Sequence, residues 1–180
     1  MSGESLNLPD YCDEVARRAA AAARTLATVP GDMKNAWLVD CAEQLRSNVS
    51  AILDGNARDV DAAEENELTD AQIDRLKLTP ERVNEISLGL ETVAQLPDPI
   101  GETIESSIRP NGLEVGKVRV PLGVVFFIYE SRPNVTADAS AICLKSGNAV
   151  ILRGGKEARH SSRAIVDQMR TTAVRRGLPE

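Results

Sequence analysis

The segment PLGVVFFIYESRPNVTADASAICLKSGNAVILRGGK, residues 121–156, decides the fold class of this 180-residue chain. It contains two short apolar runs, residues 124–129 and 149–152, which are rich in branched or aromatic residues and do not alternate with polar ones. Such runs are typical of strands buried on both faces of a parallel sheet. Between them, residues 135–146 have apolar positions at helical spacing, and Gly147-Asn148 is a helix stop. The segment therefore predicts a strand–helix–strand unit with a right-handed crossover.

Polar residues follow each of the two predicted strands. Residues 130–134, ESRPN, come directly after the first strand, and residues 153–156, RGGK, come directly after the second. Open α/β sheets bind their ligands outside the carboxyl ends of the strands. We therefore expect these two clusters to meet at one edge of the sheet and to form a ligand site.

The composition excludes several classes of protein. A hydrophobic content of 42% argues against overall disorder, and a net charge of −6 without a long basic run argues against nucleic-acid or anionic-membrane binding. No apolar run approaches the roughly 20 residues of a transmembrane helix, and the N-terminus lacks a signal-peptide pattern. The scattered cysteines Cys12, Cys41 and Cys143 indicate reduced thiols, a cytoplasmic location and no metal cluster. A Ser–His–Asp triad is disfavoured because it would have to use His160, which Arg159 flanks.

The first 100 residues predict helices. An alanine-rich helix runs from Pro9-Asp10 to about Thr28, and a second begins with Asp32 as its N-cap and reaches about Leu53. The second helix carries an apolar stripe that indicates core packing, formed by Met33, Trp37, Cys41, Leu45, Val49 and Ile52. The residues Asp54-Gly55-Asn56 are interpreted as its end.

Two shorter segments and one longer helix complete this helical part. Residues 57–66 are acidic and predict a solvated helix. Thr69 and Thr79 are helix starts, and Pro80 stands at a first helical position, where its missing N–H costs nothing. The last of these helices runs to about Gln95, and residues 96–99, LPDP, stop it.

A β-hairpin is predicted over residues 104–120. Its turn is Pro110-Asn111-Gly112, since Asn-Gly tolerates the positive φ that tight hairpins demand. An isolated two-stranded ribbon is marginal in water. We therefore expect the hairpin to pack on another part of the protein or on a second subunit.

An amphipathic helix is predicted from Lys156 to about Arg176, with Ile165, Met169 and Ala173 on one face and Gly177 as its C-cap. A third strand should follow, and the sequence does not contain it. Two parallel strands do not make a stable sheet. The expectation is that the chain is the N-terminal portion of a longer protein.

The residues around the two strands resemble the aldehyde dehydrogenase superfamily. Its pattern is Pro-x-Gly-Val, a strand, an Asn near a proline, a helix ending in Gly-Asn, a second strand and then Lys-Pro-Ser-Glu. The corresponding residues here are Pro121-Leu122-Gly123-Val124, Asn134, Gly147-Asn148 and Arg153-Gly154-Gly155-Lys156. Within the superfamily, YESRPN (129–134) and LRGGKE (152–157) resemble the γ-glutamyl phosphate reductase (glutamate-5-semialdehyde dehydrogenase) family, and the resemblance covers nearly all of the chain.

This resemblance implies an α/β, aldehyde-dehydrogenase-like fold with N-terminal helices, a hairpin arm and the start of a Rossmann-like parallel sheet. Residues 1–100 would be the helical part of the cofactor domain and residues 101–120 the hairpin, used in oligomerisation. Residues 121–180 would be the first strand–helix–strand–helix of the NADP-binding sheet. The catalytic domain would be absent from this chain.

The implied activity is the NADPH-dependent reduction of L-glutamyl 5-phosphate to L-glutamate 5-semialdehyde with release of phosphate, a step of proline biosynthesis. The family's nucleophile is a downstream cysteine that forms a thioester with the acyl group. None of the three cysteines here stands at that position, and Cys143 lies at a packing position of its helix. The 180-residue chain alone is therefore expected to be inactive.

Asn134 matches the superfamily asparagine whose side-chain N–H₂ helps to hold the oxyanion. A donor of this kind is worth about 10²–10³ in rate in other enzymes. The alternative is that Asn134 caps the following helix, with Pro133 setting the turn. Both roles are open at this point.

The cofactor residues implied by the resemblance are Arg153, Gly154, Gly155 and Lys156. Arg153 takes the place of a lysine that touches the cofactor ribose, and the two glycines let the backbone approach the ligand. Lys156 replaces a glutamate that binds ribose hydroxyls in NAD-dependent members, and an ammonium attracts the 2′-phosphate of NADP. Ser131 and Arg132 are candidates for the acyl phosphate or the pyrophosphate. The alternative is that these side chains are only solvated: Arg153 and Lys156 at a helix start, and Ser131 and Arg132 in a surface turn.

The resemblance also implies partners. These are the small-molecule substrate, further copies of the chain through the hairpin, and glutamate 5-kinase. Two other interpretations compete: a non-catalytic nucleotide-binding or assembly module of this length, and one half of a bifunctional kinase–reductase. Met1 lies close to the first helix, which argues against the latter.

Overall fold

The computed structural model describes residues 7–65 and 68–179. The chain begins with five helices: α1 (Leu8–Leu26), α2 (Gly31–Ser47), α3 (Val49–Glu65), α4 (Asp70–Leu76) and α5 (Pro80–Gln95). The hairpin β1 (Thr103–Ile108) and β2 (Glu114–Val118) follows. The rest is β3 (Val124–Ile128), α6 (Pro133–Lys145), β4 (Ala149–Arg153), the 3₁₀ turn η1 (Lys156–Ala158) and α7 (Arg159–Arg175).

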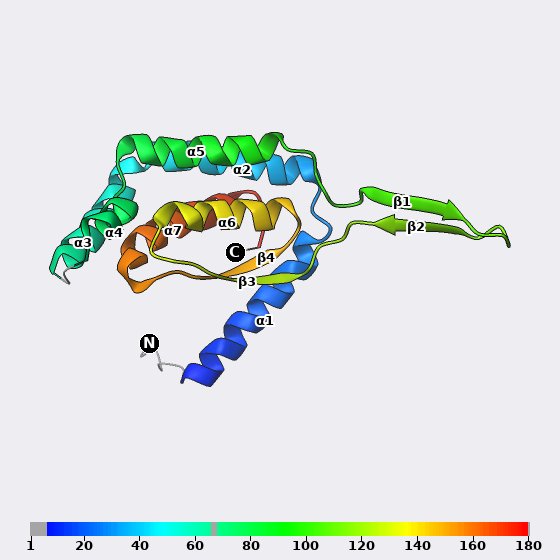
Figure 1. Cartoon of the computed structure of the whole chain (residues 1–180), viewed down its shortest axis with the longest axis horizontal. Helices are drawn as coiled ribbons and strands as arrows, with labels where there is room; N and C mark the ends of the chain where they lie inside the picture. The colour runs from blue at the N-terminus through cyan, green and yellow to red at the C-terminus, as the bar shows by residue number, and fades with distance from the viewer. Residues whose placement is uncertain (1–6, 66–67, 180) are drawn as a thin grey trace.

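The elements form layers around the β3–β4 pair (Figure 1). Helices α2 and α5 lie side by side and pack on α6 and α7. Helices α6 and α7 lie between that pair and the strands, whereas α1 crosses the strands on the other side. The body is an α/β assembly, as the sequence predicted.

The parallel pairing of β3 with β4 confirms the predicted strand–helix–strand unit. The register runs from Val124 opposite Ala149 to Ile128 opposite Arg153. The expectation of strands buried on both faces is wrong for this chain, because Phe126 is 61% exposed and Ile128 is 70% exposed. Within the described residues β3 pairs with β4 alone, so its other edge and part of its surface have no cover.

The second predicted helix is two helices. Helix α2 ends before Asn48, whose side-chain amide donates to the Gln44 carbonyl at 2.9 Å. Helix α3 then continues through Asp54-Gly55-Asn56, so the predicted stop there is wrong. The reason is tertiary: Gly55 lies against the His160 carbonyl, where an added Cβ would be 3.0 Å away, and the Asn56 amide donates to the Leu76 carbonyl at 2.8 Å.

The start of α2 and its apolar stripe differ slightly from the prediction. Pro30, not Asp32, is the N-cap of α2, and Asp32 lies in its first turn. The apolar stripe is buried as predicted from Trp37 to Leu45 and at Ile52, with Met33 exposed.

The acidic helix is not simply solvated. Asp59 is 3% exposed, and its carboxylate accepts hydrogen bonds from the backbone N–H groups of His160 and Ser161 at 3.0 and 2.7 Å. It thereby satisfies the first turn of α7. Asn66, the last residue of that predicted segment, lies outside the described residues.

The predicted helix start at Thr79 and the predicted helix stops at Gly147 and Gly177 are confirmed. The Thr79 hydroxyl accepts from the Arg82 N–H at 3.2 Å. Gly147 and Gly177 have φ values of 72° and 68° and close α6 and α7 with the paired backbone bonds of a Schellman motif.

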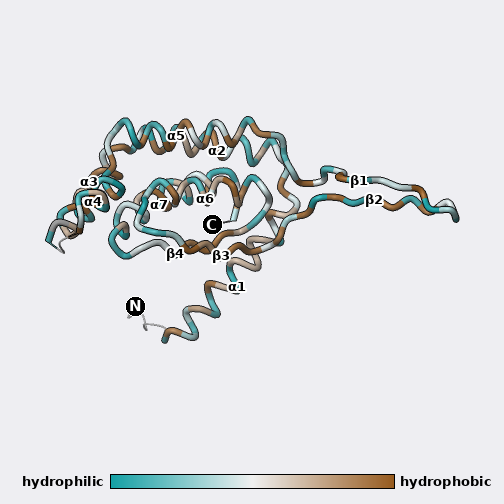
Figure 2. Tube along the Cα trace, in the orientation of Figure 1, coloured by the Kyte–Doolittle hydropathy of each residue, from teal (hydrophilic) through white to brown (hydrophobic). Residues whose placement is uncertain are grey.

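The hairpin is confirmed as an antiparallel pair with its turn at Gly112, whose φ is 83°. It projects from the body (Figure 1), and Figure 2 colours parts of it as hydrophobic. Its apolar side chains are exposed, Ile108 by 77%. No part of the described chain covers it. Contact with a second subunit stays a prediction.

One hydrophobic core joins the N-terminal helices to the crossover unit. It contains Trp37 and Leu45 of α2, Leu90 of α5, Ala137 of α6 and Ile165 of α7. The domain boundaries at 100 and 120 stay a prediction. None of the described helices has the length and apolarity that crossing a membrane requires.

Candidate functional site

The two polar clusters predicted from the sequence meet at the carboxyl ends of β3 and β4. The Tyr129 N–H donates to the Arg153 carbonyl at 3.1 Å, which continues the ladder by one residue past the end of β3. The Ser131 hydroxyl donates to the Glu157 carboxylate. The loops after the two strands therefore lie against each other at the edge where α/β sheets bind ligands.

Gly154 and Gly155 are required by this close approach. A Cβ at Gly154 would lie 3.0 Å from the Tyr129 ring, and a side chain at Gly155 would overlap the Ser131 hydroxyl. The glycines thus have a role within the protein as well as the predicted one toward a ligand.

Arg153 and Lys156 are exposed cations at the same edge. Arg153 ends β4 and donates to the Gly154 carbonyl, and Lys156 begins η1. Within the described residues, Lys156 makes no ion pair through its ammonium. Both positive charges are accessible to a phosphate from solvent.

Ser131 and Arg132, in contrast, already have partners in the protein. The hydrogen bond from Ser131 lowers the pKa of Glu157, with smaller contributions from the backbone and Lys156. The Arg132 Nε lies 2.7 Å from the Glu130 carboxylate. Either side chain would have to exchange a carboxylate for an incoming phosphate.

Asn134 lies in the first turn of α6, after Arg132 as N-cap and Pro133 as the first helical residue. It is therefore not the N-cap, and the capping alternative is wrong. Its amide donates to the Asp138 carboxylate one turn later, at 3.3 Å, and the residue is exposed. The amide is available to a ligand, while its role at an oxyanion stays a prediction.

A cavity of about 400 Å³ opens beside Asn134, between α4, α5 and the first turns of α6. Its lining consists of Asp74, Arg75, Lys77, Leu78, Arg82, Glu85, Ile86, Arg132, Asn134 and Asp138. Burial raises the pKa of Asp138, and the hydrogen bond from Asn134 opposes that shift in part. Sequence reasoning missed this cavity. The spacing of Asn134 and Asp138 puts both on one helix face, but nothing in the sequence shows that α4 and α5 face them.

None of the three cysteines lines this cavity or belongs to the two polar clusters. Burial raises the pKa of Cys41 to about 12 and also raises that of Cys143, which disfavours the reactive thiolate form of both. Cys12 is exposed on α1. The described residues contain no group of three His, Cys, Asp or Glu side chains placed to hold a metal ion.

Similar structures define the class of protein. A γ-glutamyl phosphate reductase from Thermotoga maritima superposes with a TM-score of 0.89 at 39% identity, over 92% of this chain and 40% of that one. A γ-glutamyl phosphate reductase from Saccharomyces cerevisiae superposes with a TM-score of 0.83 at 32% identity, over 92% of this chain and 43% of that one. An acetylating aldehyde dehydrogenase from Geobacillus thermoglucosidasius shares the fold alone, with a TM-score of 0.57 at 16% identity, over 91% and 33%. The fold is aldehyde-dehydrogenase-like.

Curated proteins with similar sequences are γ-glutamyl phosphate reductases. The chain is 52% identical to the γ-glutamyl phosphate reductase of Rhodopirellula baltica over 98% of its own length and 41% of the relative's. It is 49% identical to the reductase of Shewanella denitrificans, over 100% of its own length and 42% of that relative's. No family model matches the chain. The chain is a homologue of the γ-glutamyl phosphate reductases, corresponding to their N-terminal portion, and it spans about two fifths of the length of these curated relatives.

Proposed function

We propose that this chain contributes the NADP(H)-binding edge and the oxyanion donor of a γ-glutamyl phosphate reductase. The reaction reduces L-glutamyl 5-phosphate to L-glutamate 5-semialdehyde and releases phosphate, a step of proline biosynthesis. The observation that carries the proposal is the exposed pair Arg153 and Lys156 at the carboxyl ends of two parallel strands. Sequence identity of about half to reductases of that name supports it.

The residues at this edge fit a phosphorylated dinucleotide. Lys156 would attract the 2′-phosphate, and Arg153 would contact the ribose. The tight backbone at Gly154 and Gly155 leaves no side chain between these cations and solvent. Bound NADPH supplies the hydride. Asn134 would donate its N–H to the oxygen of the acyl group as negative charge develops there.

The nucleophile must come from residues other than those described here. Thiolate attack on an acyl phosphate needs an accessible, ionisable cysteine. Cys41 and Cys143 are buried and have raised pKa values. Cys12 is exposed, but it lies on α1, which crosses the strands on the side opposite to α6 and Asn134. We therefore propose that the missing catalytic cysteine belongs to the part of the reductases that this chain does not span.

The hairpin is the proposed oligomerisation arm. Its support is the exposure of Ile104, Ile108 and Leu113, because apolar side chains on a projecting ribbon gain by burial against another copy. A cytoplasmic location and a contact with glutamate 5-kinase remain proposals drawn from the family alone.

The test is an assay of the complete protein that carries this segment, beside the 180-residue chain. The complete protein should oxidise glutamate 5-semialdehyde with phosphate and NADP, faster than with NAD. The 180-residue chain should show no turnover. A complete protein that binds NADPH but lacks this activity would instead be a non-catalytic nucleotide-binding module.

A further inference from the structure

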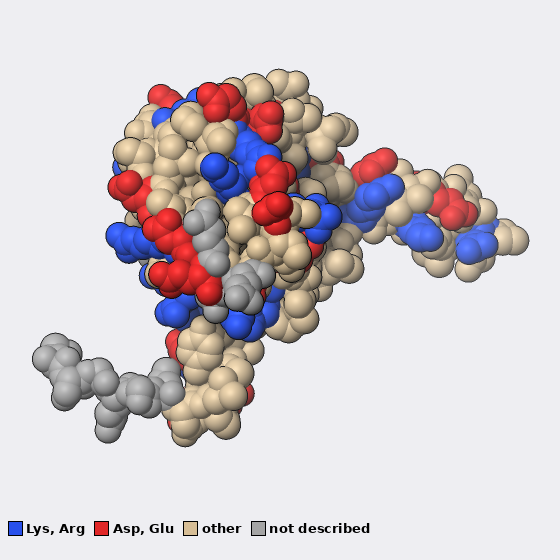
Figure 3. Space-filling model, turned by 60° about the vertical axis from the view of Figure 1, so that its left-hand side comes forward, with Lys and Arg blue, Asp and Glu red and all other residues tan. Residues whose placement is uncertain are grey.

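The cavity beside Asn134 is lined by charges of both signs. Its walls carry the cations Arg75, Lys77, Arg82 and Arg132 and the carboxylates Asp74, Glu85 and Asp138. Figure 3 turns the side with α3 and α4 forward and shows Lys and Arg interspersed with Asp and Glu there. A mixed lining of this kind suits a ligand that itself carries both charges.

We propose that this cavity binds the α-amino acid end of the substrate, with the Asp138 carboxylate receiving the substrate's α-ammonium group. This inference rests on the proposed function, because Asn134 would hold the acyl end of the same molecule. Asp138 lies one helical turn from Asn134, so one substrate can reach both.

Asp138 is a half-buried carboxylate that lacks a cation. Its one hydrogen bond of the described structure comes from the Asn134 amide, at 3.3 Å. It faces α5 at Gly89, where an added Cβ would lie 3.8 Å from its Oδ1. No Lys or Arg of the described chain lies within ion-pair distance of it. A carboxylate that is partly removed from water gains from a positively charged partner.

The opposite wall leaves one ammonium without a partner. Arg82 donates to the Lys77 carbonyl at 2.7 Å and pairs with Asp74 at 2.9 Å, and Arg132 pairs with Glu130 at 2.7 Å. The Lys77 ammonium has no hydrogen bond or ion pair within the described residues. Lys77 directly follows α4 and lines the same cavity as Asp138, where it would be a partner for the α-carboxylate.

Two simpler ligands fit less well. A bare phosphate would lie beside the carboxylates of Glu85 and Asp138, which repel it. A divalent cation needs several oxygen or nitrogen ligands together, and the described residues contain no such group of three. An amino acid would present its α-ammonium to Asp138 and its α-carboxylate to Lys77.

The experiment uses the complete protein and two pairs of ligands. The first pair, L-glutamate and glutarate, is titrated by calorimetry; the second, glutamate 5-semialdehyde and 5-oxopentanoate, is compared in steady-state assays. Wild type should prefer the amino-bearing member of each pair. Asp138→Asn should lower that preference by about 10- to 100-fold, the worth of a charged hydrogen bond, and leave the KM for NADP unchanged.

Asp138→Glu keeps the charge and should restore part of the preference. Asp167→Asn is the matched control, since Asp167 also lies one turn from its partner, Arg163, but on α7 outside the cavity. Equal losses for both members of each pair in Asp138→Asn, or a wild type without preference for L-glutamate over glutarate, would overturn the inference. A wild type that prefers L-glutamate through Asp138 but lacks reductase activity would sink the proposed function and leave the inference standing.

Discussion

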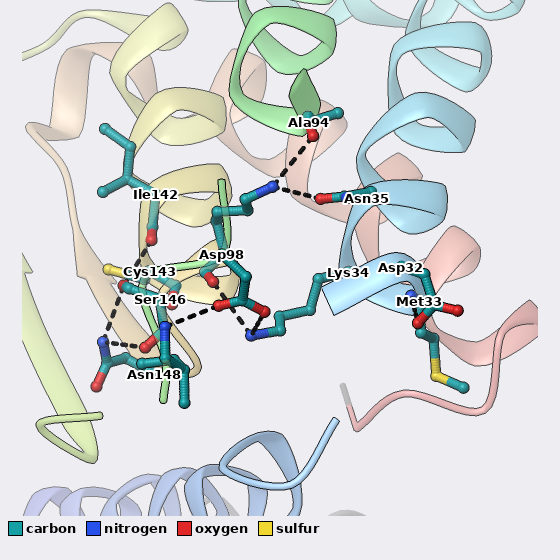
Figure 4. A network of polar contacts seen from close by, with 12 residues as sticks. Asp32, Met33, Lys34, Asn35, Ala94, Asp98, Ile142, Cys143, Ser146 and Asn148 are labelled. Carbon is teal, nitrogen blue, oxygen red and sulfur yellow. Dashed lines mark hydrogen bonds and ion pairs between the residues drawn. The ribbon is translucent and has the colours of Figure 1, made fainter. Parts of the chain in front are cut away.

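The two ends of helix α6 treat their polar groups in opposite ways. At its C-terminal end, Lys34 is 1% exposed, and its Nζ lies 2.7 Å from the Asp98 carboxylate and 3.3 Å from the Lys145 carbonyl (Figure 4). Lys145 is 4% exposed and donates to the Ala94 carbonyl at 3.1 Å and to Asn35. This network ties α2, α5 and the segment before the hairpin to the end of α6.

At the N-terminal end of α6, by contrast, polar side chains are accessible and lack partners. Asn134 is exposed, and within the described residues Asp138 lacks a cation and Lys77, which lines the same cavity, lacks an anion. A buried polar group that is satisfied by its own protein contributes to structure, whereas an accessible one without a partner is available to a ligand. The amino edge of the sheet is therefore interpreted as framework and the carboxyl edge as the site.

The largest effect is expected from breaking the network at the framework end. Lys34→Ala leaves Asp98 without its cation and opens a space among α2, α5 and α6. Loss of one partner of a buried pair typically costs about 3–5 kcal/mol, and we expect a loss of this order in the free energy of unfolding, measured with denaturant. Arg163→Ala removes an exposed pair as a control and should change it by less than about 1 kcal/mol. Equal effects of the two substitutions would mean that the framework interpretation is wrong.

The second effect concerns cofactor choice at the carboxyl edge. Lys156→Glu removes an attraction for the 2′-phosphate and adds repulsion, while it supplies an acceptor for ribose hydroxyls. We expect NADPH affinity of the complete protein to fall roughly 10- to 10³-fold, with NADH binding unchanged or improved. The measurement is cofactor titration at two salt concentrations, and the preference of the wild type should shrink as salt rises.

A matched control for this substitution lies on the hairpin. Lys117 of β2 is also an exposed lysine, and Lys117→Glu makes the same charge change away from the carboxyl edge. It should leave both cofactor affinities as they are. A preference for NADPH that survives Lys156→Glu would reduce Lys156 to a solvated surface residue.

The third effect concerns Asn134 at the N-terminal end of α6, where turnover and the free energy of unfolding are expected to respond differently. Asn134→Ala should lower turnover about 10²-fold while NADPH binding is nearly unchanged, because the lost donor acts on the oxyanion. Its free energy of unfolding should change by no more than about 0.5 kcal/mol, as for exposed positions in general. A parallel loss of stability and activity, with normal turnover per folded molecule, would contradict the oxyanion role.

The carboxyl edge could be predicted from the sequence because its signals are local. Apolar runs without alternation predict buried strands, and the polar residues that follow them must share an edge once the strands are parallel. This reasoning placed Arg153 to Lys156 beside Ser131, as observed. Helix ends at Thr79 and Gly147 followed from capping and positive φ, which are also local.

The framework end could not be predicted, because its partners are far apart in the chain. Lys34 and Lys145 are separated by 111 residues, and either would pass for a surface lysine in the sequence. The same cause explains the wrong stop at Asp54-Gly55-Asn56: these residues favour a turn locally, but contacts with His160 and Leu76 keep them helical. The cavity was missed for this reason too, since α4 and α5 meet α6 only through tertiary packing.

The smallest expected effect is on the pH dependence of the free energy of unfolding, through the carboxylate Asp98 of the framework network. Burial alone would raise the pKa of Asp98, but the hydrogen bonds from Lys34 and the Ile100 N–H and the charges of Lys34 and Lys145 outweigh it, so the pKa is lowered below its ordinary value of 3.8. A carboxyl with a lowered folded pKa stabilises the fold fully above its unfolded pKa, and this stabilisation is lost as the pH falls through the folded pKa. The free energy of unfolding should therefore fall below about pH 4 more steeply in wild type than in Lys34→Met, in which the lowering interaction is gone. Denaturant unfolding of both proteins near neutral pH and near pH 3 gives the comparison, and the other carboxylates cancel in the difference. A difference between the two proteins that stays constant across this range would show that Asp98 is not held ionised by Lys34.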